Sequence, residues 1–329
     1  MNRYARQMVL PPIGADGQER LDRAHVLIVG AGGLGVPALQ YLVGAGIGRI
    51  TLVDGDRVEE TNLHRQPIYG MHHISRFKAQ AAAEVMAAMN PGVVVTPRVG
   101  WLTPETAPAL VEGADIVLDC ADSFAVSLTL SDTCLTAAVP LIAGSALALS
   151  GYVAGCCGGA PSLRAIFPDL PVRGATCATA GVMGPVVGMM GALQAQMALA
   201  VFLKMSPSPL GRLISVDAER WRMGGFRFDS APEPASALPF IAQTQVLPDD
   251  LIIDLRTEAS RPFHPDARHL PPERIGDLHP PSGARVVLAC RTGLRAHNAG
   301  QLLQSRWPGS IALLAVTDPE PGKPHDKLP

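Results

Sequence analysis

The sequence has almost no net charge, no regularly spaced cysteines and no long uninterrupted hydrophobic run. Its 27 basic and 29 acidic residues give a formal net charge of -2, which makes no electrostatic case for binding nucleic acid or an anionic membrane. The cysteines form no disulfide framework, a pattern typical of a reducing cytoplasm. They are Cys120, Cys134, Cys156, Cys157, Cys177 and Cys290. We therefore expect a cytoplasmic protein whose partners must be inferred from its sites.

Neither a signal peptide nor a membrane span is predicted. The stretch from Met1 to Pro11 is polar and contains Arg3 and Arg6, unlike the apolar centre of a secretory signal. The apolar run 181–205 has repeated interruptions, so we expect a buried core helix there rather than a span. The interruptions are Gly184, Pro185, Gly188, Gly191, Gln194 and Gln196.

The strongest positive signal is a βαβ unit that begins at Val26. The β-branched run from Val26 to Val29 predicts a strand buried on both faces of a parallel sheet. The glycines that follow allow a tight turn and close approach to a phosphate, which the N-terminus of the next helix favours. A second strand ends at Asp54, about 20 residues further on, where an acid holds a nucleotide ribose. The glycines are Gly30, Gly32, Gly33 and Gly35.

The residues after Asp54 distinguish between nucleotides. A βαβ unit alone favours NAD, its commonest ligand. Here the polar loop 55–66 brings Asn62 and Arg65 to the carboxyl edge of the sheet, where an arginine can hold phosphate with two hydrogen bonds. Lys78 begins an alanine-rich helix, a position that the helix dipole disfavours for a cation and that favours a phosphate partner. The pattern therefore favours a polyphosphate ligand over NAD.

Four carboxylates are expected beside the glycine turn. Asp54 and Asp56 follow one strand, and Asp119 and Asp122 follow another buried strand, predicted to start near Ala114. Acids beside a polyphosphate favour Mg²⁺, which takes one or two carboxylates plus substrate oxygens. Any one of these acids alone is equally consistent with a helix cap or a surface position.

Several motifs are spaced in order along residues 3–228. They are RYARQ from Arg3, GAGGLG from Gly30, LVDGDRVEETNLHRQ from Leu52, FKA around Lys78, Asn90-Pro91 and DCADS from Asp119. Together they resemble the ubiquitin-activating-enzyme-like adenylyltransferases of the MoeB/ThiF/HesA type. The resemblance implies a Rossmann-like domain that binds ATP and Mg²⁺ and transfers an adenylyl group.

The resemblance also implies roles for the matching positions. Arg65 and Lys78 would bind phosphates and act in catalysis, and Asp122 would hold Mg²⁺. Arg6 would reach into the ATP site of the partner subunit, so a homodimer is expected. The nucleotide contacts would be Gly30, Gly32, Gly33, Gly35, Asp54, Asp56, Thr61, Asn62, Leu63, His64, Arg65, Lys78, Asp122 and Ser123. Ser123 departs from the family, which usually has Asn there.

The chain departs from the family again at the structural zinc site. The family carries two Cys-x-x-Cys pairs, but this chain has residues 162–165 and 231–235 at those places, without cysteine. The adjacent Cys156 and Cys157 cannot replace four suitably spaced thiolates. We therefore expect no structural zinc.

Cys177 matches a family cysteine that precedes the long core helix. In some relatives that cysteine bonds the activated carrier or a sulfur donor, and in others it is dispensable. A helix N-terminus nearby favours the reactive thiolate, whereas a cysteine before an apolar helix is often an inert core residue. The sequence leaves both roles open.

A second, smaller unit follows a segment rich in proline, alanine and serine. A predicted strand runs into Cys290 at a strand-to-helix turn, where free N–H groups and arginines stabilise an anionic persulfide or, equally, a phosphate. IDLR from Ile253, His269-Leu270-Pro271 and CRTGLRA from Cys290 resemble rhodanese-like sulfurtransferase domains. The resemblance makes Cys290 the sulfur-bearing residue. The family's glycine-rich stretch after the last strand is absent, so a degenerate docking domain is an alternative.

The expected architecture is α/β with two units. Residues 1–229 form a Rossmann-like adenylyltransferase domain with a mostly parallel sheet, 230–239 a linker, 240–316 a shortened rhodanese-like domain and 317–329 a disordered tail. The resemblance implies adenylation of the C-terminal carboxylate of a ubiquitin-like sulfur-carrier protein of the MoaD or ThiS type, ending in Gly-Gly. Sulfur from a cysteine desulfurase or thiosulfate would pass through Cys290, in molybdopterin or thiamine biosynthesis.

Two other functions remain as alternatives. One is a sulfur relay whose first domain serves mainly as a scaffold that binds the carrier. The retained charges of Arg65, Lys78 and Asp122 count against it. The other is a nicotinamide-dependent oxidoreductase, which the TNLHRQ loop and Lys78 disfavour.

Overall fold

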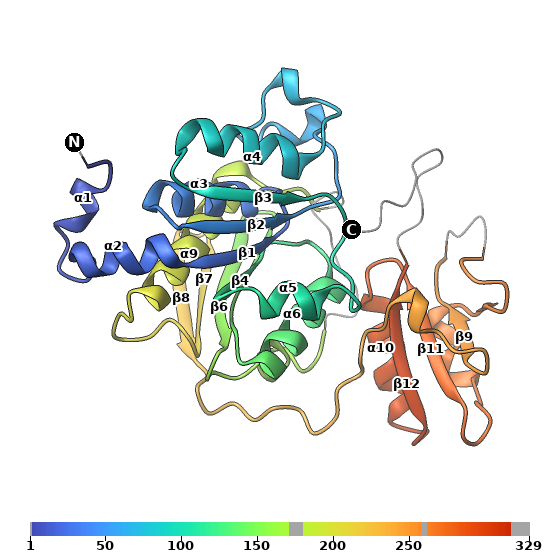
Figure 1. Cartoon of the computed structure of the whole chain (residues 1–329). Coiled ribbons are helices and arrows are strands. Elements are labelled where there is room, and N and C mark those ends of the chain that lie inside the picture. The colour runs from blue at the N-terminus through green and yellow to red at the C-terminus, as the bar shows by residue number, and fades with distance from the viewer. Residues whose placement is uncertain (1, 171–179, 258–261, 317–329) are drawn as a thin grey trace.

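The computed structural model describes residues 2–170, 180–257 and 262–316. These residues form two α/β units, each built on one sheet, that lie side by side (Figure 1). The expected tail 317–329 and Cys177 lie outside the described residues. The first sheet has eight strands in the order β3-β2-β1-β4-β5-β6-β7-β8, and the second has four in the order β10-β9-β11-β12. The expected fold class, a mostly parallel Rossmann-like sheet with a second small α/β unit, is confirmed.

The first sheet is doubly wound. Its strands are β1 (His25–Val29), β2 (Arg49–Val53), β3 (Val94–Arg98), β4 (Ile116–Asp119), β5 (Pro140–Leu147), β6 (Ser150–Cys157), β7 (Arg212–Asp217) and β8 (Arg222–Arg227). Strands β1 to β5 pair in parallel, and β6 to β8 continue the sheet antiparallel. The strand order reverses between β1 and β4, which places the ligand-binding crevice beyond their carboxyl ends.

Helices cover both faces of this sheet. They are α1 (Ala5–Met8), α2 (Gly14–Arg23), α3 (Gly35–Ala45), α4 (Lys78–Met89), α5 (Ala107–Glu112), α6 (Phe124–Ala137), α7 (Leu163–Ile166) and α9 (Gly184–Phe202), with short 3₁₀ turns η1 (Glu60–Asn62) and η2 (Met71–His73). By length and composition α9 is the one described helix that would suit a membrane span. It packs against α3, β5 and β6, as expected of a core helix.

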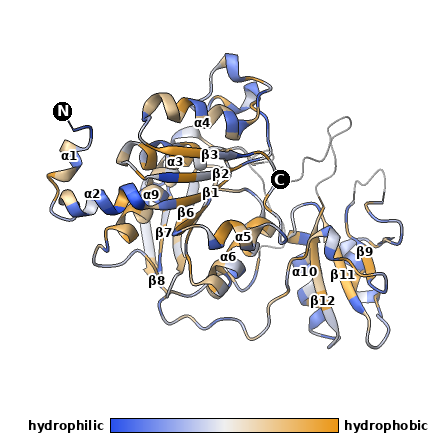
Figure 2. Ribbon diagram, viewed as in Figure 1, coloured by the Kyte–Doolittle hydropathy of each residue, from blue (hydrophilic) through white to orange (hydrophobic). Residues whose placement is uncertain are grey.

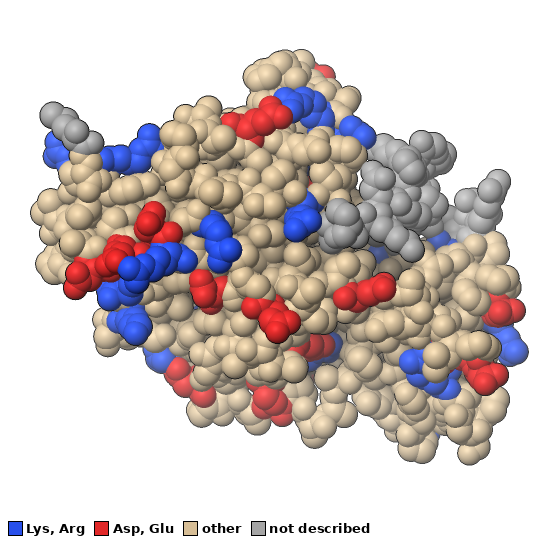
Figure 3. Space-filling view, viewed as in Figure 1, with Lys and Arg blue, Asp and Glu red and all other residues tan. Residues whose placement is uncertain are grey.

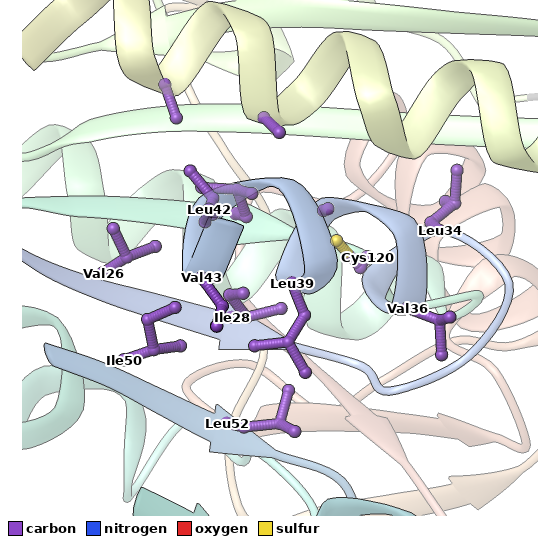
Figure 4. Packing of buried hydrophobic residues seen from close by; sticks show 14 of the residues in the cluster. Val26, Ile28, Leu34, Val36, Leu39, Leu42, Val43, Ile50, Leu52 and Cys120 are labelled. Carbon is purple, nitrogen blue, oxygen red and sulfur yellow. The ribbon is translucent and has the colours of Figure 1, made fainter. Parts of the chain in front are cut away.

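The residues of β1 alternate between two hydrophobic cores. Val26 and Ile28 belong to the core shared with α3, α4 and α9, whereas Leu27 and Val29 belong to the core shared with α5 and α6. Leu39 of α3 points from the helix toward the strands (Figure 4) and is almost fully buried. Burying one such side chain contributes about 1.5–3 kcal/mol. This packing holds the N-terminus of α3 beside the end of β1.

The second unit is a small parallel sheet. It comprises η3 (Gln243–Gln245), β9 (Leu251–Asp254), β10 (Arg268–His269), η4 (Pro272–Asp277), β11 (Arg285–Cys290), α10 (Leu294–Gln304) and β12 (Ser310–Ala315). All of its strand pairs are parallel. Its central strand β11 is coloured hydrophobic in Figure 2, as is β1 of the first sheet, and both are almost entirely buried. This pattern is typical of parallel strands covered on both faces.

The two units pack against each other through α6. Ala125 and Leu128 of α6 share a hydrophobic core with Leu238 and Phe240 and with β11. The backbone N–H of Ala125 donates to the carbonyl of Thr292, with 3.2 Å between nitrogen and oxygen. On the face shown in Figure 3, acidic and basic side chains are interspersed, consistent with the near-neutral net charge. The second unit therefore meets the first next to the carboxyl end of β4.

Candidate functional site

The turn between β1 and α3 requires glycine at two positions for steric reasons. Gly30 has φ of +102°, and a Cβ there would lie 2.5 Å from the carbonyl oxygen of Cys120. A Cβ on Gly35 would lie 1.8 Å from the carbonyl oxygen of Gly30. The backbone of this turn therefore packs directly against the residues that follow β4. Helix α3 begins at Gly35, and the N–H groups of its first turn are open to an anion.

Asp54 ties the end of β2 to this glycine turn. Its carboxylate accepts from the backbone N–H groups of Ala31 and Asp56, each at 2.7 Å. Burial raises the pKa of Asp54 to about 6, while the positive charge of Lys78 opposes the rise. A buried carboxylate with a raised pKa at a sheet edge is typical of a functional site.

Tyr69 supports the same turn, although no sequence motif marks it as a site residue. Its hydroxyl lies 3.0 Å from the carbonyl oxygen of Ala31 and 3.2 Å from that of Lys78, so it donates between the glycine turn and α4. Burial raises the pKa of Tyr69 above its ordinary value, which keeps the hydroxyl protonated. The local sequence, with Ile68 before it and Gly70 after it, gives no sign that Tyr69 is more than an ordinary core residue.

Lys78 pairs with a carboxylate at the start of α4. Its Nζ lies 2.8 Å from Oδ2 of Asp56, and the lysine is buried whereas the Asp56 side chain is half exposed. The sequence favours a phosphate partner for this cation, whereas in the described structure its partner is the carboxylate of Asp56. Because the carboxylate is open to solvent, an incoming phosphate can compete with it for the ammonium group.

The loop after β2 places its polar groups next to the glycine turn. Asn62 is buried, and Arg65 donates from Nη1 to the carbonyl of Thr61 at 3.0 Å and contacts Nε2 of His64 at 2.9 Å. Gln66 ends the motif that starts at Leu52, and the sequence pattern alone does not mark it as a site residue. It is buried beside Gly32, and its Oε1 has no hydrogen-bond partner within residues 2–170, 180–257 and 262–316. A buried acceptor without a donor is costly, so this oxygen is a candidate contact for a donor group of a ligand.

Asp119 and Asp122 lie on the other side of β1. Asp119 is buried, accepts from the N–H of Ala121 at 3.1 Å, and has its pKa raised to about 6 by burial. Asp122 is exposed, and Ser123 precedes α6 without making a side-chain cap. The structure thus brings the acids after β2 and the acids after β4 to one edge, on either side of the glycine turn, as predicted.

Arg6 lies away from this edge of its own chain. It is exposed on α1, whose Gln7 donates to the carbonyl of Ala45 at 2.8 Å. Ala45 is the last residue of α3, and the glycine turn is at the other end of that helix, about 16 Å away by its rise per residue. Figure 1 shows α1 on the side of the sheet opposite to the second unit. Arg6 therefore cannot reach the site of its own chain in this conformation.

The two segments that replace the family's cysteine pairs are joined by hydrogen bonds. The backbone N–H and hydroxyl of Ser162 donate to Glu233 at 2.6 and 2.5 Å. Next to them, Arg164 forms a bidentate pair with Asp132 at 2.6 and 2.8 Å and donates to the carbonyl of Leu238. Among the described residues no cluster of three or more His, Cys, Asp or Glu is arranged to hold a metal.

Cys290 ends β11 inside the second unit. It is 1% exposed, and the N–H of Ala296 donates to its Sγ at 3.4 Å. The turn after it contains Gly293, whose φ is +84°, and meets α6 at Ala125, two residues beyond Ser123. The structure therefore places the cysteine loop close in space to the carboxyl end of β4.

The IDLR motif forms part of the structure of the second unit. Arg256 and Asp254 are both buried and paired, with Nη2 2.8 Å from Oδ2. His269 of the His-Leu-Pro motif contacts the carbonyl oxygen of Arg256 through Nε2 at 2.8 Å. These motif residues position the strand ends around the cysteine loop.

A glycine turn, a buried acid after β2 and charged groups at a strand-order reversal define a Rossmann-type nucleotide-binding α/β protein. The chain belongs to the ThiF family, whose model matches residues 4–236. The resemblance found in the motifs is therefore confirmed at the level of the family.

Curated relatives agree with this assignment. The adenylyltransferase and sulfurtransferase uba4 of Aspergillus fumigatus is 43% identical over 218 residues, which is 63% of this chain and 44% of that protein. The Yarrowia lipolytica protein of the same name is 46% identical over 200 residues, 60% of this chain and 50% of its own length. The chain thus spans about half the length of the curated relatives it matches.

Solved structures show the same fold. Crystal structures of E. coli MccB with ATP and with MccA-N7isoASN each give a TM-score of 0.62 at 22% sequence identity, covering 69% of this chain and 72% of theirs. At this level of identity the similarity concerns the fold alone.

Proposed function

We propose that this protein, as a cytoplasmic homodimer, adenylates the C-terminal carboxylate of a small ubiquitin-like sulfur-carrier protein ending in Gly-Gly. The observation that supports this most directly is the arrangement around the glycine turn: Asp54 accepts from the N–H of Ala31, Lys78 pairs with Asp56 next to it, and the backbone of Arg65 lies beside Gly33. The relatives' names, adenylyltransferase and sulfurtransferase, and the ATP complex of MccB agree with it.

In the proposed reaction a carboxylate oxygen of the carrier attacks the α-phosphorus of ATP. The bond from that phosphorus to the bridging oxygen breaks, pyrophosphate leaves with the electron pair, and an acyl-adenylate remains. Asp54 would hold the ribose, and Arg65 and Lys78 would balance the charge that develops on the phosphates. Such a step depends mainly on positioning and electrostatics.

The donor set at this edge fits Mg²⁺. Asp122 offers an exposed carboxylate, and Mg²⁺ commonly takes one or two carboxylates together with substrate phosphate oxygens. When bound, the ion would neutralise phosphate charge. Asp122 would then hold it on the β4 side of the glycine turn, opposite Lys78.

Sulfur transfer would follow from Cys290. The terminal sulfur of a Cys290 persulfide attacks the acyl carbon, AMP leaves, and the carrier is joined to Cys290 through two sulfurs. A second thiol, for which we propose Cys177, then attacks Sγ of Cys290, releasing the carrier thiocarboxylate and leaving a disulfide that a cellular thiol reduces. Because Cys290 is 1% exposed, loading it from thiosulfate or a desulfurase requires the loop or the whole unit to move.

The test is carrier-dependent exchange of labelled pyrophosphate into ATP. With purified protein and candidate carriers ending in Gly-Gly, we expect exchange with one carrier, which would also identify the pathway as molybdopterin, thiamine or another. Asp122→Ala should lower the exchange rate roughly 100-fold, the scale of a lost electrostatic contact in a transition state. Exchange with no carrier, while thiosulfate still loads Cys290, would contradict adenylation and favour the sulfur-relay alternative.

A further inference from the structure

A partly exposed tryptophan lies at the carboxyl edge of the first sheet. Trp101 follows β3 and is 47% exposed, although large aromatic side chains are usually well buried. Its indole lies directly on the backbone of Gly55, because a Cβ added there would be 2.7 Å from Cε2 and 2.9 Å from Nε1. Gly55 is the residue after Asp54. The indole is therefore attached to the segment that carries the buried acid.

Backbone hydrogen bonds hold this contact in place. The N–H of Asp54 donates to the carbonyl of Arg98 at 3.1 Å, and the N–H of Gly100 donates to the carbonyl of Asp54 at 3.4 Å. These bonds join the ends of β2 and β3 immediately before Trp101. These backbone hydrogen bonds fix the Trp101 backbone next to Asp54, so the position of the indole depends on the sheet as well as on the side-chain rotamer.

The strand order gives the direction in which a nucleotide would lie. The glycine turn follows β1, Asp54 follows β2 and Trp101 follows β3, and these strands are neighbours in the order β3-β2-β1. Adjacent strands are about 4.8 Å apart, which is comparable to the distance from phosphate to ribose and from ribose to base. With phosphates at the glycine turn and the ribose at Asp54, the base comes to the end of β3.

We propose that Trp101 forms one wall of the base subsite and stacks on the adenine ring of ATP. The proposal rests on the proposed adenylation function and adds a residue that selects the nucleotide base. One side of the indole is occupied by Gly55, and its exposed part is available to a ligand. Stacking favours the larger purine ring over a pyrimidine, since the overlapping area is greater.

The first experiment uses the fluorescence of Trp101 alone. The chain has three tryptophans, so the double variant Trp221→Phe/Trp307→Phe leaves Trp101 as the only one. Titration with ATP should quench its emission, with a midpoint equal to the ATP dissociation constant measured by calorimetry. An unchanged emission while calorimetry reports ATP binding would overturn the proposal and leave adenylation intact.

The second experiment measures selectivity in the otherwise unchanged chain. Trp101→Leu should weaken ATP binding roughly 5- to 100-fold and reduce the preference for ATP over CTP, as expected when one base–aromatic stack is lost. Trp101→Phe should restore most of both. The matched control Trp221→Leu, at a site 92% exposed beyond β7, should change neither.

Two outcomes separate this proposal from the function on which it rests. If Trp101→Leu and wild type have equal ATP affinity and equal ATP/CTP preference, Trp101 does not contact the base, although the protein still binds ATP. No binding of ATP to the wild-type protein by calorimetry would overturn the adenylation function and the base subsite together.

Discussion

At the scale of single residues, Asp54 links the fold to the proposed chemistry. Its carboxylate is almost fully buried yet bonded to two backbone N–H groups. The pKa of Asp54 in the folded protein is about 6, above the ordinary 3.8. The protonated carboxyl group therefore favours the folded state fully below pH 3.8, and this stabilisation is lost as the pH rises through 6. The ionised side chain thus opposes folding at pH 7, which is typical of a group retained for a ligand.

This pKa predicts a pH dependence of ATP binding. Below about pH 6 the carboxyl becomes protonated and loses acceptor capacity for ribose hydroxyls, so we expect ATP affinity to fall several-fold between pH 7 and pH 5. Asp54→Asn should bind ATP more weakly at pH 7 and lose most of this dependence. Calorimetry across the pH range checks this, and an identical profile in both proteins would assign the effect to another group, such as ATP itself.

At the scale of elements, a hydrogen-bonded clamp joins the segment that starts α7 to the segment that follows β8. Ser162 is buried, and Glu233 accepts from both its backbone N–H and its hydroxyl. The family's zinc joins these same segments in the resemblance described above. The clamp and the neighbouring Arg164–Asp132 pair therefore join segments that zinc would join in the family.

The clamp predicts a stability change without any metal dependence. Glu233→Ala leaves two buried donors of Ser162 unpaired, so the free energy of unfolding should fall by about 1–3 kcal/mol. Glu219→Ala, at an exposed turn between β7 and β8, should change it by less than about 0.5 kcal/mol. Denaturant unfolding measures both. A chelator should leave the wild-type melting temperature unchanged, and a lowered value would contradict the prediction that no structural zinc is bound.

At the scale of the whole molecule, the separation of Arg6 from its own site leaves two possibilities for its role. Either Arg6 serves the site of a partner subunit, as the resemblance implies, or it has no catalytic role. The anchoring of α1 at the far end of α3 excludes a contribution within the same chain in this conformation. A twofold dimer would give each site one arginine from the other subunit.

Mixed dimers test this arrangement. Pyrophosphate exchange should be strongly reduced in the Arg6→Ala and Asp122→Ala homodimers, whereas a mixed dimer, isolated with two affinity tags, keeps one complete site. We expect it to show about half the wild-type rate per dimer. An inactive mixed dimer would show that Arg6 acts in the same site as Asp122 of its own chain. Full activity of the Arg6→Ala homodimer would show that Arg6 has no role in catalysis.

The sequence alone determined the local features of this protein. Continuous apolar runs, glycines and helical periodicity specify strands, a turn and helices through short-range sterics, so the nucleotide-binding unit and Asp54 were predictable. The spaced motifs made the family predictable as well. The mostly parallel first sheet and a small second α/β unit were predicted from the same patterns, whereas the strand orders come from the structure. The linker and domain boundaries, and the roles of the site residues, remain predictions.

Only the tertiary structure decided which distant residues meet. The pairing of Lys78 with Asp56, the bonds from Ser162 to Glu233 and the packing of Trp101 on Gly55 join segments 22 or more residues apart. Burial of Cys290 likewise depends on how the second unit folds and packs. Such contacts depend on the sum of packing and hydrogen bonding over the whole chain, which no local pattern encodes.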